Sequence, residues 1–357
     1  MSSTGAPRAD CPVCRDERQY VGWDGQRWTT LAELRSAGHR GRIAEEGPGI
    51  IGIGIEPSFA VGQRALLVQS AAGNILWDCL SYLDEDLVAQ VNALGGISAI
   101  AISHPHFYGS MIEWSDAFDA PVYLHAADRQ WVGRPDPAVV HWEGDTHELA
   151  PGLTLINAGL HFAGGTVLHW QDGEAGLGAL LTGDIIQVPM DRRWTSFLYS
   201  YPNHIPERPQ LIRRALELLQ PYGFERIYAS FWRRIVDIDG VGALRRSADR
   251  YPRFALDDRQ PGPGHTALGT GPRQPPRCAA SRPLRPRFAP DDQTNLIADM
   301  DRPPASGSSN GTDSVRAIYG VVGMPLTRRP AARLRGRYGY NVVEGYQQLD
   351  ELLTRIG

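Results

Sequence analysis

The chain has 357 residues, of which 42% are hydrophobic and 21% are charged, a balance typical of a globular protein. Its net charge of −4, spread over this length, gives no electrostatic reason to expect binding to nucleic acid or to a membrane surface. The sequence has neither an apolar run of about 18 residues nor a signal-peptide-like N-terminus, so we expect a cytoplasmic protein without a transmembrane helix.

Residues 1–50 are predicted to form a polar N-terminal arm that carries the motif Cys11-Pro-Val-Cys14. A Cys-X-X-Cys turn holds two thiolates at the separation of zinc ligands, but a structural zinc site needs four ligands. No second such motif follows, although His39 is a candidate third ligand. The motif is therefore either half of a second, structural zinc site at Cys11 and Cys14 or an exposed turn without metal. A thioredoxin-like redox role is disfavoured because no β–α–β pattern follows.

Residues 51–253 alternate between strand-like and helix-like segments. The apolar spacing predicts a helix over residues 84–94, ended by the pair Gly95-Gly96, and a second helix over 211–219. The predicted strands are 64–70, 75–79, 97–102, 122–125, 153–157, 166–170, 179–181 and 226–230. A hairpin followed by strand–helix units indicates the α/β class, with two mixed β-sheets flanked by helices in an αββα sandwich.

The remainder of the chain changes in composition after residue 253. Residues 254–313 are rich in Pro, Gly, Arg and Ser and show no periodicity. Such a segment cannot bury enough apolar surface to offset its ordering entropy, so it is predicted to be a disordered linker. Residues 314–357 regain an apolar run at 317–322 and a predicted helix near 342–356, and form a short C-terminal segment to which the sequence assigns no role.

Three histidines and one aspartate stand where predicted strands end. An apolar strand runs directly into Ser103-His104-Pro105-His106, so two imidazoles reach a loop where their rings can converge on a metal ion. His161 lies at a strand-to-turn junction among small residues, and Asp184 closes the apolar segment that ends in Thr-Gly-Asp. The desolvated carboxylate of Asp184 needs a partner, which can be a metal ion, a helix cap or an arginine.

These motifs, in this order, resemble those of the metallo-β-lactamase superfamily, which includes glyoxalase II and related hydrolases. The family pattern is HxHxDH, then a histidine in a Gly-rich turn, then a Thr-Gly-Asp aspartate, then a late histidine. His104 and His106 match its first two histidines, His161 matches the third and Asp184 matches the aspartate. The resemblance runs from about Gly52 to Tyr251. It implies an αββα fold with a zinc site held by His104, His106, His161 and Asp184.

The chain departs from the family pattern at three positions. Tyr108 stands where the family has the aspartate of HxHxDH, and Gly109 stands where it has the next histidine. The late histidine is expected near Ser230-Phe-Trp-Arg-Arg, and that stretch has none. Because these family residues bind a second metal, the resemblance implies a single zinc ion here.

The activity that the resemblance implies is hydrolysis of an ester, thioester or lactone bond in a small-molecule substrate by a metal-bound hydroxide. Asp184 would then be the fourth ligand or the base that orients the water. The phenol of Tyr108 is a candidate donor to the developing oxyanion, and the alternative is a tyrosine packed at the rim of the site.

Two other interpretations remain open. The three missing residues also fit a non-catalytic metal-binding or scaffold member of the same fold. His204, in an aromatic segment flanked by prolines, is a further candidate ligand, with an ordinary surface position as its alternative. A nuclease activity is disfavoured, because nuclease members of the superfamily use two metal ions and the domain has no basic surface.

Overall fold

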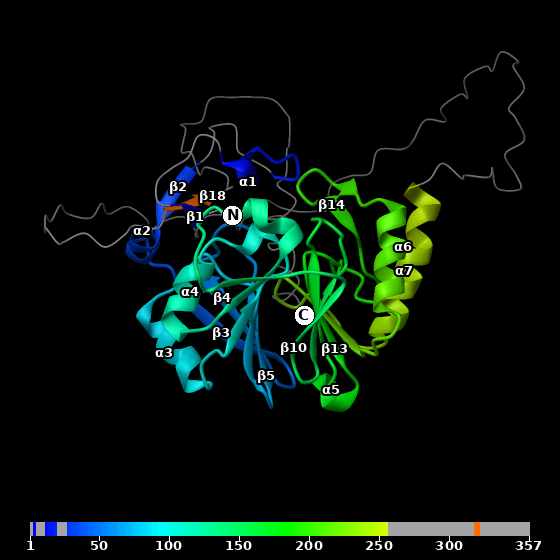
Figure 1. The fold of residues 1–357 in the computed structure, drawn as a ribbon, viewed down its shortest axis with the longest axis horizontal. Coiled ribbons are helices and arrows are strands. Elements are labelled where there is room, and N and C mark those ends of the chain that lie inside the picture. The colour runs from blue at the N-terminus through cyan, green and yellow to red at the C-terminus, as the bar shows by residue number, and fades with distance from the viewer. Residues whose placement is uncertain (1–2, 5–10, 20–26, 256–317, 322–357) are drawn as a thin grey trace, which may run out of the picture. The chain divides into compact units, whose positions relative to one another are not determined.

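Two β-sheets face each other in the computed structural model, and helices cover the outer face of each sheet (Figure 1). The structure describes residues 3–4, 11–19, 27–255 and 318–321. The αββα arrangement expected from the sequence is confirmed. The predicted linker 254–313 and the C-terminal segment 314–357 lie outside the described residues, apart from 254–255 and 318–321.

The first sheet has the strand order β3-β4-β5-β6-β7-β8-β9. Neighbouring strands from β3 to β6 run antiparallel, and those from β6 to β9 run parallel. The strands are β3 (Arg40–Gly47), β4 (Ile50–Glu56), β5 (Ala65–Ser70), β6 (Gly73–Trp77), β7 (Ala99–Ala101), β8 (Val122–His125) and β9 (Val139–Trp142). The sheet therefore begins at Arg40, within the predicted N-terminal arm of residues 1–50. The prediction missed this strand because a half-buried edge strand rich in charged residues looks like a polar segment in the sequence.

The second sheet has the strand order β10-β11-β12-β13-β16-β17. Its neighbours are antiparallel except for β13 and β16, which run parallel. The strands are β10 (Thr146–Ala150), β11 (Leu153–Asn157), β12 (Thr166–Trp170), β13 (Ala179–Gly183), β16 (Arg226–Ala229) and β17 (Ile235–Val236). Helices α6 (Pro209–Leu219) and α7 (Gly240–Ala255) pack on its outer face through a core that includes Ile212, Leu219 and Leu244.

The central strands of the first sheet, such as β5 and β7, are buried on both faces, which explains their continuous apolar runs. In β5, Leu67 points into the core beneath helices α3 (Glu85–Ala93) and α4 (Met111–Phe118), whereas Leu66 and Val68 point into the core between the sheets. Side chains alternate along a strand, so a strand covered on both sides has no polar face. Two packed layers thereby hold each strand end in a fixed position.

Shorter elements complete the described part of the chain. They are β1 (Ser3–Thr4), α1 (Pro12–Arg15), β2 (Arg27–Thr30), α2 (Leu31–Ser36), the 3-10 helices η1 (Pro105–Phe107) and η2 (Ala126–Trp131), α5 (Gly173–Gly176), β14 (Leu198–Ser200), β15 (Ile205–Pro206) and β18 (Ile318–Val321). Strand β18 lies between β1 and β2 in a small antiparallel sheet. Among the described residues, no helix combines the length and the apolar composition that crossing a bilayer requires.

Every strand of the two large sheets lies between residues 40 and 236, and the helices that cover them end at Ala255. We therefore predict that a chain truncated after Ala255 folds and keeps the metal content of the full chain. Circular dichroism, thermal unfolding and metal analysis test this. The full-length variant Tyr319→Pro is the matched control, because proline removes a backbone donor from β18 without shortening the chain. Insoluble or metal-free truncated protein would show instead that the segment containing β18 completes the core.

Candidate metal centre

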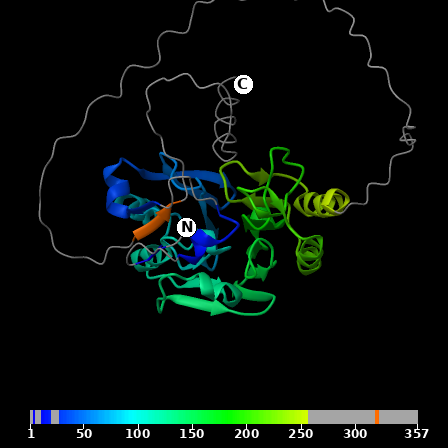
Figure 2. The ribbon, with the colours of Figure 1, turned by 90° about the horizontal axis from the view of Figure 1, so that it is seen from above.

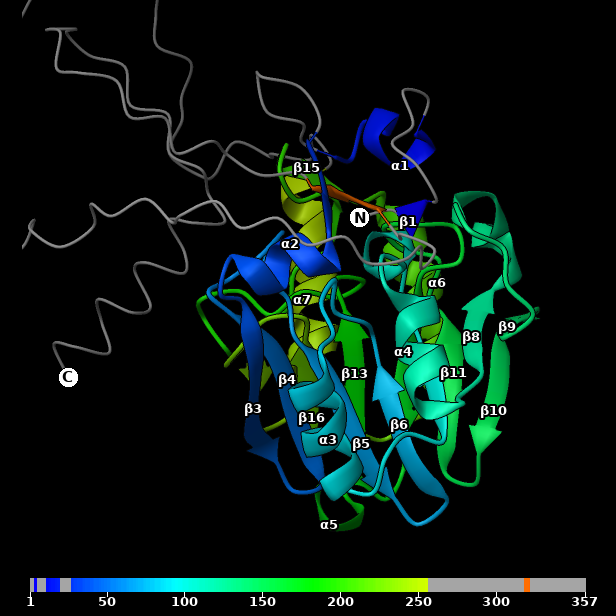
Figure 3. The same cartoon turned by 90° about the vertical axis from the view of Figure 1, so that its left-hand side faces the viewer.

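The predicted ligands come from loops at one edge of the two sheets. Strand β7 ends two residues before Ser103, and β13 ends immediately before Asp184. The arrowheads of β6, β8 and β13 point to the edge at which α1 lies (Figure 3). Because the carboxyl ends of these strands share one edge, residues far apart in the sequence meet there.

The structure brings the three predicted histidines together. Their ring centroids form a nearly equilateral triangle, with His104 and His106 4.9 Å apart and His161 5.0 Å from each of them. When one nitrogen is taken from each ring, the three nitrogens all lie within 4.8 Å of one another. The Nε2 atom of His161 is 3.3 Å from Nδ1 of His106. This matches the spacing of roughly 3.4 Å that two nitrogens have when each binds one tetrahedral zinc at about 2.1 Å.

Hydrogen bonds on the outer side of two rings fix which nitrogen faces the centre. The hydroxyl of Ser103 donates to Asp78 Oδ1 at 2.7 Å, so it can only accept from His104 Nδ1, which is 2.8 Å away. His161 Nδ1 lies 2.9 Å from the carbonyl oxygen of Tyr199 and must donate to it. Both rings therefore present Nε2 as a lone pair to the centre, the orientation that metal-binding histidines require.

Burial keeps these imidazoles neutral. His104 is 1% exposed and His161 is 3% exposed. Burial, with the neighbouring ring charges, holds the pKa of His104 and His106 well below the usual value, and burial lowers the pKa of His161 to about 4. Within the described part of the chain, the buried Nε2 atom of His104 has no hydrogen-bond partner, which is costly for a polar atom. A neutral donor set with a lone pair that no protein group satisfies fits a metal ion.

Asp184 lies beside this cluster. Its Oδ2 atom is 3.9 Å from His104 Nε2, and the hydroxyl of Ser230 is the side-chain hydrogen-bonding group beside this buried carboxyl. Burial raises the pKa of this carboxyl to about 7. Asp184 does not belong to the mutually close group formed by the three histidines. It adjoins that group on the side of His104, and its role as fourth ligand stays a prediction.

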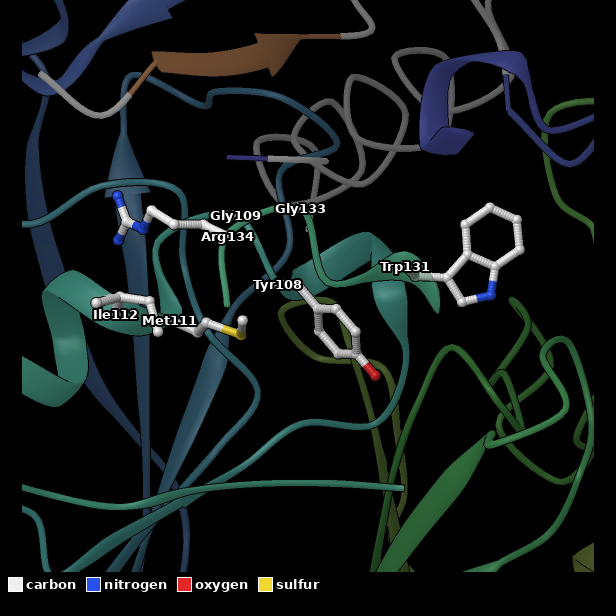
Figure 4. A pocket seen from close by; sticks show the side chains of 7 residues that line it. All are labelled: Tyr108, Gly109, Met111, Ile112, Trp131, Gly133 and Arg134. Carbon is white, nitrogen blue, oxygen red and sulfur yellow. The ribbon is translucent and has the colours of Figure 1, made fainter. Parts of the chain in front are cut away.

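Tyr108 is buried in the apolar core beneath α4 and lines a cavity with Met111, Ile112 and Trp131. Figure 4 shows its hydroxyl turned away from Ile112 and Arg134. Burial raises the pKa of Tyr108, so the phenol keeps its proton and remains a hydrogen-bond donor. Its catalytic role stays a prediction.

The other candidates lie elsewhere. His204 is exposed on the β14–β15 hairpin, which agrees with the surface position given as the alternative to a ligand role. His39 faces Pro57, whose carbonyl oxygen is 2.9 Å from its Nδ1. Cys11 is buried at the start of α1. Among the residues that the structure describes, only the three-histidine cluster gathers three or more metal-ligating side chains, so the second zinc site at Cys11 and Cys14 gains no support.

Sequence reasoning missed three residues that act on the cluster, namely Asp78, Arg18 and Glu207. Asp78 follows the apolar strand β6 and carries the same signal that singled out Asp184, a carboxylate at a buried strand end. No pattern marks Arg18 or Glu207, because both contact the backbone of His161 from distant parts of the chain.

Comparisons with known proteins identify the family of the chain. Residues 60–230 match the family model of the metallo-beta-lactamase superfamily. The chain is 46% identical over 251 residues to the uncharacterized protein YmaE of Bacillus subtilis (strain 168), an alignment that covers 70% of this chain and 91% of YmaE. Among solved structures, VMB-1 matches at 11% identity and a TM-score of 0.46, covering 60% of this chain and 98% of that one. A metallo-β-lactamase of Cronobacter sakazakii matches at 19% identity and a TM-score of 0.40, covering 60% and 96%.

Removing the hydroxyl of Ser103 tests the outer hydrogen bonds. In Ser103→Ala, His104 Nδ1 loses its acceptor and the orientation of the ring is no longer fixed, so we predict metal affinity about 10- to 100-fold weaker. Competition with a chromophoric chelator measures the change. Ser115→Ala is the matched control, because that buried hydroxyl bonds the Ala120 carbonyl within another part of the fold. Equal losses in both variants would contradict a specific effect on His104.

Proposed function

Since the chain belongs to the metallo-β-lactamase superfamily, whose members are mostly metal-dependent hydrolases, we propose that it is a zinc-dependent hydrolase of a small-molecule ester, thioester or lactone. One observation carries the proposal. Three neutral imidazoles, those of the buried His104 and His161 and of the half-buried His106, converge on a common point at the edge of the sheets.

The donor set supports zinc and a single ion. Imidazole nitrogens and one carboxylate are ligands that suit zinc, and three nitrogens from the protein leave a coordination position open. A zinc ion held there would lower the pKa of water to about 7 and polarise a carbonyl oxygen. A second ion is not proposed, because Tyr108, Gly109 and the stretch Phe231–Arg234 offer none of the family's remaining ligands.

The chain's own residues have separable roles in this proposal. Ser103 and Asp78 hold the ring of His104 with its lone pair inward. Asp184, whose pKa is raised to about 7 by burial, is the proposed fourth ligand or the base that accepts a proton from water. Tyr108, protonated because it is buried, is the proposed donor to the developing oxyanion.

The walls of the centre favour an acyl substrate. Phe107 contacts His104, Phe162 contacts His106 and Tyr201 contacts His161, with ring centroids 4.4, 4.9 and 5.3 Å apart. An aromatic lining excludes water and so strengthens electrostatic interactions within the site. It also suits an uncharged ester, thioester or lactone better than a phosphodiester, which needs several cationic groups around it.

The test combines metal content with turnover. We predict about one zinc per wild-type chain, lost in the double variant His104→Ala/His106→Ala, and cleavage by the wild type of at least one member of a panel of nitrophenyl esters, acyl thioesters and lactones. The double variant should lose at least about a thousand-fold in kcat/KM, because several kcal/mol of charge stabilisation disappear. His204→Ala is the control, since His204 is exposed and outside the cluster.

The outcomes separate the alternatives. Protein that binds zinc but cleaves none of the panel would favour the non-catalytic metal-binding or scaffold member of the fold. Folded wild-type protein that binds no metal would overturn both interpretations.

A further inference from the structure

The backbone of His161 adopts an unusual conformation. Its φ is +63°, in the left-handed region that residues with a Cβ atom rarely occupy. We propose that Arg18 and Glu207 are positioning residues that clamp this backbone and so hold the ring of His161 in the metal centre. The inference rests on the metal-binding part of the proposed function and does not depend on the substrate.

Glu207 and Arg18 form hydrogen bonds with the backbone of His161 on opposite sides of its Cα atom. Glu207 Oε2 accepts a hydrogen bond from the His161 amide at 2.8 Å, and Arg18 Nη1 donates to the His161 carbonyl oxygen at 2.8 Å. The amide and the carbonyl belong to the peptide planes before and after the Cα atom. Holding both planes fixes φ and ψ together, and thereby the direction in which the side chain leaves the backbone.

Both grips are buried and charge-assisted. Glu207 is 4% exposed and Arg18 is 8% exposed, so water competes little for these hydrogen bonds. The second carboxylate oxygen of Glu207 accepts from the backbone amide of Arg208 at 2.8 Å, just before α6. Glu207 is thus held by the helix start while it holds His161.

Arg18 is itself fixed on every side of its guanidinium. Its Nε and Nη2 atoms each lie 2.6 Å from an oxygen of Asp16, which leaves Nη1 for His161. The guanidinium carbon sits 3.7 Å from the centre of the Phe162 ring. A planar fork can make these contacts at once, whereas the single ammonium of a lysine cannot.

The segment that carries Arg18 is docked onto strand β14, which also orients the ring of His161. Glu17 accepts from the Tyr199 hydroxyl at 2.6 Å, and the Arg18 carbonyl accepts from the Ser200 hydroxyl at 3.1 Å. The Tyr199 carbonyl is the acceptor for the ring of His161. Figure 2 shows α1, which leads into this segment, over the region between the two halves of the sandwich. The N-terminal segment therefore contacts both His161 and the strand that orients its ring.

Metal-binding measurements distinguish a clamp, which positions His161, from a cover, which only shields the centre from solvent. If residues 11–19 only shielded the centre, loosening them would speed metal entry and metal release alike and leave the equilibrium affinity unchanged. A clamp sets the geometry of a ligand, so loosening it lowers the affinity itself.

The experiment measures the zinc Kd of the full chain by chelator competition and the binding and release rates by stopped flow. We expect Arg18→Met and Glu207→Ala to raise Kd about 10- to 100-fold. Glu207→Gln, which keeps one carbonyl acceptor, should recover most of the affinity, and Arg18→Lys only part of it. Arg193→Met is the matched control. Arg193 binds both carboxylate oxygens of Asp191, two residues earlier, as Arg18 binds Asp16, but it does so on the exposed surface.

A second readout needs no metal. In the apo protein, the rate at which diethyl pyrocarbonate modifies His161, followed by peptide mass spectrometry, should rise in Arg18→Met and Glu207→Ala, while modification of the exposed His204 stays constant. If either variant fails to fold, Asp16→Asn weakens the hold on Arg18 without touching His161 and should shift Kd in the same direction.

An unchanged Kd with faster binding and release would overturn the clamp in favour of a cover, as would unchanged His161 reactivity in both Arg18→Met and Glu207→Ala. Wild-type protein that binds no zinc would refute the proposed function, while the modification rates would still decide whether the clamp exists.

Discussion

A hydrogen bond on one side of an imidazole decides what its other side can do, and the candidate metal centre depends on this constraint. The Tyr199 carbonyl can only accept, so it fixes the proton of His161 on Nδ1; Ser103, committed to Asp78, does the same for His104. Burial then removes the alternative of protonating the inner nitrogens. The result is two inward lone pairs, of which the one on His104 Nε2 has no hydrogen-bond partner among the described residues and costs free energy unless a cation satisfies it.

The rest of the fold keeps these partners in register. Strands buried on both faces have no freedom to slip, because a shift by one residue would exchange the side chains of two different cores. The loops that follow β7 and β13 therefore begin from fixed points, and they carry His104 and Asp184. The aromatic rings of Phe107, Phe162 and Tyr201 then enclose the histidines in an apolar wall.

Local signals made much of this predictable from sequence. The predicted bounds of β8, β11 and β12 are confirmed. Helix α3 ends at Ala93, and the pair Gly95-Gly96 that follows its C-cap has positive φ at both glycines, as expected of a helix end. The convergence of His104, His106 and His161 followed from strand ends and a family pattern. Edge strand β3 was not predicted, because its charged residues hide the alternation of apolar and polar side chains that is typical of a strand. Arg18 and Glu207 were not predicted, because a side chain that binds the backbone of a residue far away in the sequence produces no pattern in the sequence.

The small sheet has a consequence for how the chain is assembled. Strand β18 lies between β1 and β2, so two strands near the beginning of the sequence are joined through one encoded far downstream. During synthesis on the ribosome, β1 and β2 have to wait for a partner that emerges long after both large sheets are complete. Closing so long a loop is entropically unfavourable and slow. The sandwich can therefore mature first, with this sheet added as a late, separately reversible step.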